Sequence, residues 1–162
     1  MRGKWERGIQ PRNFAWIMRD KLAVSERPGG YARNHRKVRR HEEILWLRNQ
    51  GFTRVVSMLP SSHNLHAYDE LGMRWWHFPF ASTSEAKQVL GDLYPQLKQS
   101  VAAGEKLLLH QEELGDRVMG VIAGFLLWSG LVDTGAHAVT ITEQILHRQM
   151  GPAGRELSLI HI

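Results

Sequence analysis

The chain has 162 residues, of which 43% are apolar, and a formal net charge of +5. This length suits one domain with a hydrophobic core and is too short for two ordinary domains. The sequence contains no cysteine, which excludes disulfides, thiolate metal ligands and thiol nucleophiles.

The first ten residues, MRGKWERGIQ, are charged and contain no apolar run that could act as a signal peptide. The longest apolar stretch, Val118 to Val132, is interrupted by glycines. It is also shorter than the roughly 20 residues that a membrane-spanning helix needs. We therefore expect a cytoplasmic location and no membrane span.

The first third of the chain predicts two strands and a helix. Apolar residues alternate over 13–25 around a turn at Arg19-Asp20, which indicates a short hairpin. After a break at Arg27 to Gly30, an apolar stripe predicts a helix from about Asn34 to Asn49. Gly51 is placed to end this helix.

The middle of the chain predicts three strands and a long helix. The runs at 53–59 and 73–78 are rich in β-branched and aromatic residues, and the segment between them has helical spacing and ends at Gly72. An amphipathic helix then extends to Gly104. The three consecutive leucines within 106–110 suit a central parallel strand that is covered on both faces.

Two further helices are predicted, an apolar one over about 117–129 and a last one that is capped by Asp133 or Thr134 and extends to Met150. The alternation of strands and helices predicts an α/β domain with a mainly parallel sheet. Ligand sites of such sheets lie at the carboxyl ends of the strands, so the loop after the 106–110 strand should determine the function.

That loop places an arginine seven residues after a strand-ending histidine, with one glycine between them. It consists of His110, Gln111, Glu112, Glu113, Leu114, Gly115, Asp116 and Arg117. This pattern resembles the phosphate-binding loop of the cysteine-dependent tyrosine and dual-specificity phosphatases, which has His-Cys, five residues and Arg. In that family, backbone N–H groups at a helix N-terminus hold the phosphate and the arginine binds two of its oxygens. The cysteine thiolate is the nucleophile.

The resemblance extends over most of the chain. Residues 13–16 and 22–29 are similar to the opening of small atypical dual-specificity phosphatases, and Trp128-Ser129-Gly130 and Gly151-Pro152 match the last two helices of the family. It implies a three-layer tyrosine-phosphatase-like α/β fold, with a mainly parallel central sheet flanked by helices.

The implied domain covers 13–152, between a basic N-terminal tail at 1–12 and a C-terminal tail at 153–162.

The sequence departs from the family at each step of the chemistry. Gln111 stands in place of the cysteine, and a neutral amide cannot attack phosphorus. The family's general acid is an aspartate on the loop after the strand that corresponds to 73–78, but residues 79–83 contain no carboxylate. Val118 replaces the hydroxyl that assists the second step. We therefore predict a pseudophosphatase with no catalytic residue and no cofactor, which acts as a binding or regulatory module.

The loop itself carries three carboxylates, on Glu112, Glu113 and Asp116, which should oppose the binding of a dianion. Arg117 and Gly115 remain the candidate anion-binding residues, although the carboxylates could instead neutralise Arg117. We expect a structural role for His110. The alternative from another class is an active phosphohydrolase of the same superfamily that uses atypical residues.

A basic cluster precedes and begins the first helix, and we predict that it binds the partner. It consists of Arg27, Arg33, Arg36, Lys37, Arg39 and Arg40. Such a cluster favours anionic partners, so we expect a protein, phosphorylated or acidic. A solvated helix end is the alternative interpretation. An anion or nucleic-acid binder is a further one, but no base-reading motif is present.

A metal site is not expected. His63, His66 and Glu70 have helical spacing and could present ligands on one face. Because no further strong ligand stands at a recognised spacing, we interpret them as a solvated helix face.

Overall fold

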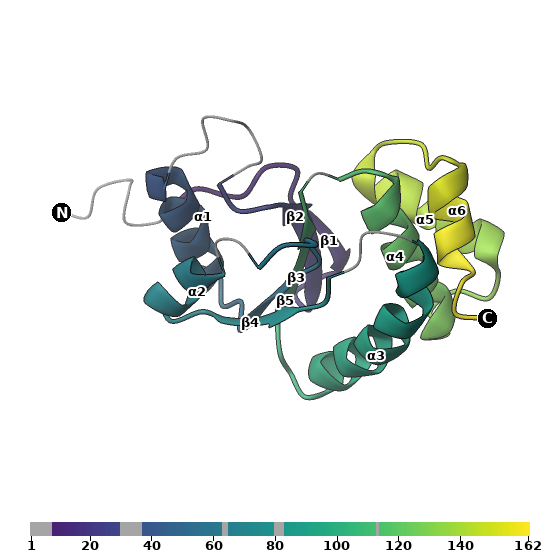
Figure 1. Cartoon of the computed structure of the whole chain (residues 1–162), viewed down its shortest axis with the longest axis horizontal. Coiled ribbons are helices and arrows are strands. Elements are labelled where there is room, and N and C mark those ends of the chain that lie inside the picture. The colour runs from purple at the N-terminus through teal and green to yellow at the C-terminus, as the bar shows by residue number, and fades with distance from the viewer. Residues whose placement is uncertain (1–7, 30–36, 63–64, 80–82, 113) are drawn as a thin grey trace.

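The structure is a computed structural model, and it describes residues 8–29, 37–62, 65–79, 83–112 and 114–162. A central sheet separates two layers of helices: α1 and α2 lie on one side, and α3, α4, α5 and α6 lie on the other (Figure 1). This is the three-layer α/β arrangement that the sequence predicts.

Within the described residues, the sheet has five strands, in the order β1-β2-β5-β3-β4. Its strands are β1 (Ala15–Met18), β2 (Leu22–Glu26), β3 (Arg54–Ser57), β4 (Arg74–His77) and β5 (Leu107–Gln111). Only the hairpin of β1 and β2 is antiparallel, and the other pairs are parallel. The predicted hairpin, the mainly parallel sheet and the central place of the three-leucine strand are all confirmed.

The strands bury side chains on both faces of the sheet. Leu107 and Leu109 pack into the larger core, under α3 to α6, whereas Leu108 packs into the smaller core, under α1 and α2. Alternate residues of a strand point to opposite faces, so an uninterrupted run of leucines serves both cores. The helices are α1 (Lys37–Asn49), α2 (His66–Glu70), α3 (Thr83–Ala102), α4 (Asp116–Trp128), α5 (Gly135–Leu146) and α6 (Pro152–Ser158).

The C-terminal region differs from the prediction in two ways. Helix α5 is capped by Thr134 as expected, and the Thr134 hydroxyl accepts a hydrogen bond from the His137 N–H at 3.1 Å. It ends at Leu146 rather than Met150, because His147 takes a left-handed conformation with φ 55°. The sequence did not predict α6, because we assigned most of its residues to the C-terminal tail at 153–162. The expected start of α1, near Asn34, lies outside the described residues.

Helix α6 packs against α4 through glycines. A Cβ atom on Gly120 would lie 2.7 Å from the Gly154 carbonyl oxygen and 2.8 Å from Leu157 Cβ. Close contact between two backbones needs small residues on both sides. This contact depends on the steric fit of two helices, which the apolar periodicity of the sequence does not indicate. The sequence therefore did not predict α6. No helix within the described residues combines the length and the apolar character that crossing a bilayer requires.

Candidate functional site

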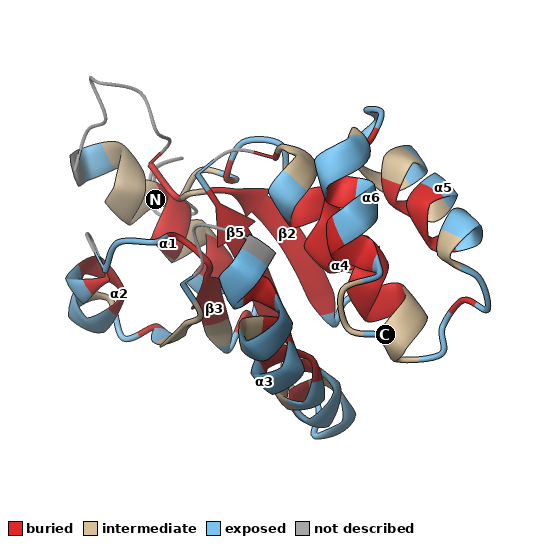
Figure 2. Ribbon diagram, turned by 45° about the vertical axis from the view of Figure 1, so that its right-hand side comes forward, coloured by how far each residue is buried: buried red, intermediate tan, exposed pale blue. Residues whose placement is uncertain are grey.

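The predicted site lies where β5 ends and α4 begins. Strands β2, β3 and β5 are almost entirely buried, and so are the inward residues of α4, while the outer face of α3 is exposed (Figure 2). The loop between β5 and α4 therefore connects a buried strand to a buried helix. This is the position at which open α/β sheets bind ligands.

Gln111 is turned into the protein and hydrogen-bonded there. Its side chain is 6% exposed, and Nε2 donates to the Met58 carbonyl at 3.1 Å. The Met58 N–H in turn donates to the His110 carbonyl at 3.0 Å. The Gln111 amide thus continues the pairing of β3 with β5 beyond the strand ends, which gives this residue a structural role.

His110 is also buried, at 1% exposure. Its Nε2 lies 3.2 Å from the Tyr68 hydroxyl. Burial lowers the pKa of His110 to about 4, against a smaller opposing effect of a hydrogen bond with the Gln111 backbone. Burial also raises the pKa of Tyr68, so both groups are neutral at neutral pH.

A small cavity of about 10 Å³ lies beside His110 and Tyr68. Arg27, Arg40 and Ser57 also line it. A space of this size holds about one water molecule.

Two of the loop carboxylates interact with distant parts of the chain. Glu112 Oε1 lies 3.7 Å from Arg27 Nη1. Asp116 Oδ1 accepts a hydrogen bond from the Gly151 N–H at 2.8 Å, immediately before α6. Glu113 lies outside the described residues. The carboxylates of Glu112 and Asp116 therefore have partners that sequence spacing did not indicate.

The two predicted anion-binding residues lie at the start of α4. Gly115 is the N-cap of this helix, with extended backbone and no side-chain cap. Arg117 lies in the first turn and is exposed. The N-terminal end of a helix favours anions, so the position is chemically suitable for an anion contact.

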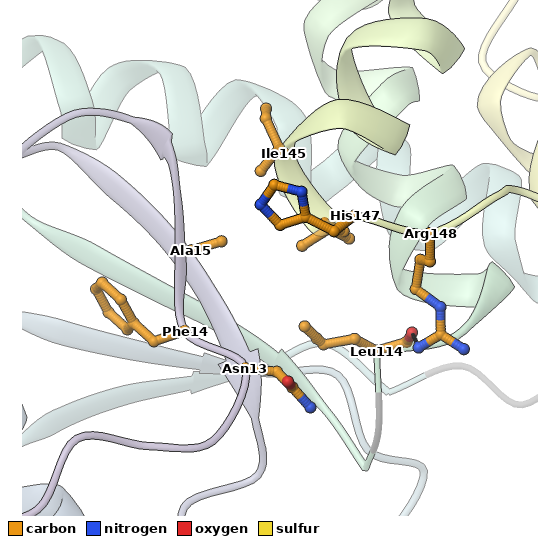
Figure 3. Close-up of a pocket in the computed structure, with 8 residues that line it drawn as sticks. Asn13, Phe14, Ala15, Leu114, Ile145, His147 and Arg148 are labelled. Carbon is orange, nitrogen blue, oxygen red and sulfur yellow. Dashed lines mark hydrogen bonds between the residues drawn. The ribbon is translucent and has the colours of Figure 1, made fainter.

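Sequence reasoning missed Arg148, which contacts the loop from the end of α5. Its Nη1 donates to the Leu114 carbonyl. The two residues also line a cavity together with Asn13 and His147 (Figure 3). No local pattern could have linked them, because they are 34 positions apart.

The members of the basic cluster that the structure describes contact other parts of the same chain. Besides the Arg27 contact with Glu112, Arg39 Nε donates to Glu43 Oε2 at 3.1 Å. Glu43 is 1% exposed, and it also accepts from the Gly29 N–H at 2.8 Å. Burial raises the pKa of Glu43 and lowers that of Arg40. The predicted Arg33 and Arg36 and the Lys37 side chain lie outside what the structure describes.

The described residues that we considered as metal ligands, His66 and Glu70, do not form a metal site. His66 and Glu70 are both exposed on α2, and Glu70 Oε2 lies 3.4 Å from His41 Nε2. His63 lies outside the described residues. Within the described ranges, no three His, Asp or Glu side chains cluster so that they could hold a metal ion.

No protein-family profile matches the sequence, and no curated protein matches it. Several solved structures do match the fold. One is kinase associated phosphatase with its catalytic-site cysteine replaced by serine, which has a TM-score of 0.73 at 16% identity over 93% of both chains. The chain has the tyrosine-phosphatase-like fold.

Two further solved structures agree. Tk-PTP in its active form has a TM-score of 0.68 at 16% identity, over 91% of this chain and 93% of that one. A tyrosine-to-histidine variant of human DUSP28 has a TM-score of 0.67 at 16% identity, over 92% of both chains. At such low identity the likeness concerns the fold, so the chemistry must be argued from this chain's own residues.

Proposed function

We propose that the chain is a pseudophosphatase, a phosphatase-fold domain that binds or regulates a partner without hydrolysing phosphate esters. The observation that carries this proposal is Gln111. It occupies the end of β5, where the phosphatase pattern has cysteine, and its amide is buried and donates to the Met58 carbonyl. A neutral amide in this bond has neither the charge nor the freedom of a nucleophile.

Two further features support the proposal. Residues 79–83, after β4, include no carboxylate that could protonate a leaving oxygen. Val118, the residue after Arg117, is fully buried in the core and offers no hydroxyl. Restoring catalysis would therefore require more than one substitution.

The proposed partner is a protein with a phosphorylated or acidic segment, met by Arg117 and by the basic cluster at 27–40. Arg117 is exposed at the start of α4, where the helix dipole favours an anion. The charges of Glu112 and Asp116 are partly satisfied within the chain, which weakens the repulsion that the sequence alone suggests.

Hydrolysis of p-nitrophenyl phosphate tests the lack of catalysis. We expect no turnover above that of the buffer, and none in Gln111→Cys, because the side chain at this position is buried and directed toward the Met58 carbonyl. Turnover by the wild-type protein that disappears in Arg117→Ala would instead establish an active phosphohydrolase with atypical residues.

Thermal melting with a phosphotyrosine peptide tests the binding role, since a ligand that binds only the folded state raises the melting temperature. We expect a rise that is lost in Arg117→Ala and retained in Arg19→Ala. Arg19 is an exposed arginine in the β1–β2 turn, so it controls for general charge. An equal rise in both variants would exclude Arg117 as the anion contact.

A further inference from the structure

A cavity of about 680 Å³ opens beside the loop, between the start of β1 and the end of α5. Three segments far apart in the sequence enclose it, and Figure 3 shows their side chains around one hollow. Its lining includes Asn13, Ala15, Leu114, Leu146, His147 and Arg148. The volume lies within the range of small-molecule pockets.

The inner wall of this cavity is apolar. Leu114, at 3% exposure, belongs to the larger core, and Ala15 and Leu146 pack against that core. The side chains of Ala15 and Leu114 point into the hollow (Figure 3). The Phe14 ring turns away toward Trp16, 5.2 Å between ring centroids, so the cavity is not filled by it.

The other side of the cavity is polar and positively charged. The left-handed turn at His147 ends α5 and directs its imidazole toward β1, while the Arg148 guanidinium lies beside Leu114 (Figure 3). Arg148 uses one N–H group for the Leu114 carbonyl, and a guanidinium has five donors.

Arg148 differs from Arg155 and Arg27 in its charge balance. Arg155 Nη2 lies 3.9 Å from Glu143 Oε2, and Arg27 faces Glu112. Among the described residues no carboxylate forms an ion pair with Arg148. Glu26 is 8% exposed, and its Oε1 accepts a hydrogen bond from Asn13 Nδ2 at 3.0 Å. This carboxylate therefore already has a partner within the chain.

We propose that this cavity binds a small amphipathic anion, namely a medium-chain carboxylate. Its apolar chain contacts Ala15, Leu114 and Leu146, and its carboxylate accepts hydrogen bonds from Arg148. Arginine and carboxylate form strong, charge-assisted hydrogen bonds, and burial of the chain supplies the rest of the affinity. The site does not use Arg117 and is independent of whether the loop hydrolyses phosphate.

Calorimetric titration with decanoate tests the head group and the chain separately. We expect decanoate to bind, and decanol and butyrate to bind at least about tenfold more weakly, since each lacks one of the two contacts. Decanol that binds as tightly as decanoate would overturn the role of Arg148.

Arg148→Gln should weaken decanoate binding about tenfold or more, because a hydrogen bond to a charged group is lost. Arg155→Gln is the matched control, since that arginine is already paired with Glu143, and it should leave the affinity unchanged. Equal affinity in both variants would overturn the proposal.

A substitution that fills the cavity gives a test independent of charge. Ala15→Trp should abolish decanoate binding, whereas Ala136→Trp, at an exposed position of α5, should retain it. If Ala15→Trp fails to fold, amide NMR shifts of the wild-type protein locate the ligand. Shifts at Ala15, Leu114 and Arg148 would support the site, and shifts confined to other regions would refute it.

Discussion

Helix α4 begins in a polar loop and continues into an apolar contact with α6, and the two regions are held by different means. Along the contact with α6, Gly120 and Gly154 bring two backbones together. At the loop, hydrogen bonds and an ion pair reach distant segments, as in Gln111 to Met58 and Glu112 to Arg27. The contact between the two helices depends on steric fit, whereas the loop depends on polar partners. Residues of the loop can therefore change while the framework persists.

The largest expected change in stability comes from a substitution that disrupts the apolar contact between α4 and α6. Gly120→Val should destabilise the protein by about 3 kcal/mol, because added atoms collide with the Gly154 backbone and cannot be accommodated by a side-chain rotation. The collision follows from the 2.7 Å approach of a Cβ to the Gly154 carbonyl oxygen. Urea unfolding measures the change. Wild-type stability in this variant would show that α6 does not need close contact with α4.

The second prediction concerns the polar side and its dependence on pH. The pKa of His110 is about 4 in the folded protein, below its ordinary value of 6.5. Between these values the unfolded chain binds a proton that the folded chain does not, so stability is full above about pH 6.5 and falls as the pH is lowered. We expect His110 to account for a loss of about 2 kcal/mol between pH 7 and pH 5.

The measurement compares urea unfolding of the wild-type protein and His110→Gln at both pH values. The difference between the proteins removes the contributions of other titrating groups, including Glu43, whose raised pKa acts in the opposite direction. An identical pH dependence in the two proteins would contradict the buried, neutral histidine.

A smaller effect is expected at Gln111 itself. Gln111→Met keeps the length of the side chain but removes the donor to the Met58 carbonyl. An unsatisfied buried carbonyl costs about 1–2 kcal/mol. Gln144→Met, at an exposed position of α5, is the control and should change the free energy of unfolding little. Equal stability of both variants would mean that Gln111 has no structural role.

The smallest expected effect is a gain in stability. Gly91 lies exposed within α3, and a Cβ there would meet nothing within 4 Å. Gly91→Ala should stabilise the protein by about 0.5–1 kcal/mol, since alanine loses less backbone freedom on folding. Thermal unfolding checks the sign. A loss of stability would show that α3 is strained at this point.

The sequence predicted the strands and most helices because their signals are local. Three leucines at 107–109 indicate a strand buried on both faces, and Thr134 indicates a helix start. The contacts of the loop could not be predicted in this way. Met58 lies 53 positions from Gln111, and the hydrogen bond of Asp116 reaches 35 positions to Gly151. Such pairs depend on where the fold places each segment. The spacing of residues along the chain does not indicate this placement.

The order of the strands has a consequence for synthesis on the ribosome. β5 is the last strand to be made, yet it pairs with both β2 and β3, which do not pair with each other. Until residues 107–111 emerge, the β1–β2 and β3–β4 pairs cannot be joined, and β2 and β3 each lack a partner at the inner edge. Unpaired strand edges promote aggregation, and non-local pairing slows folding. The nascent chain therefore passes through a vulnerable interval that ends only when β5 inserts between the two pairs.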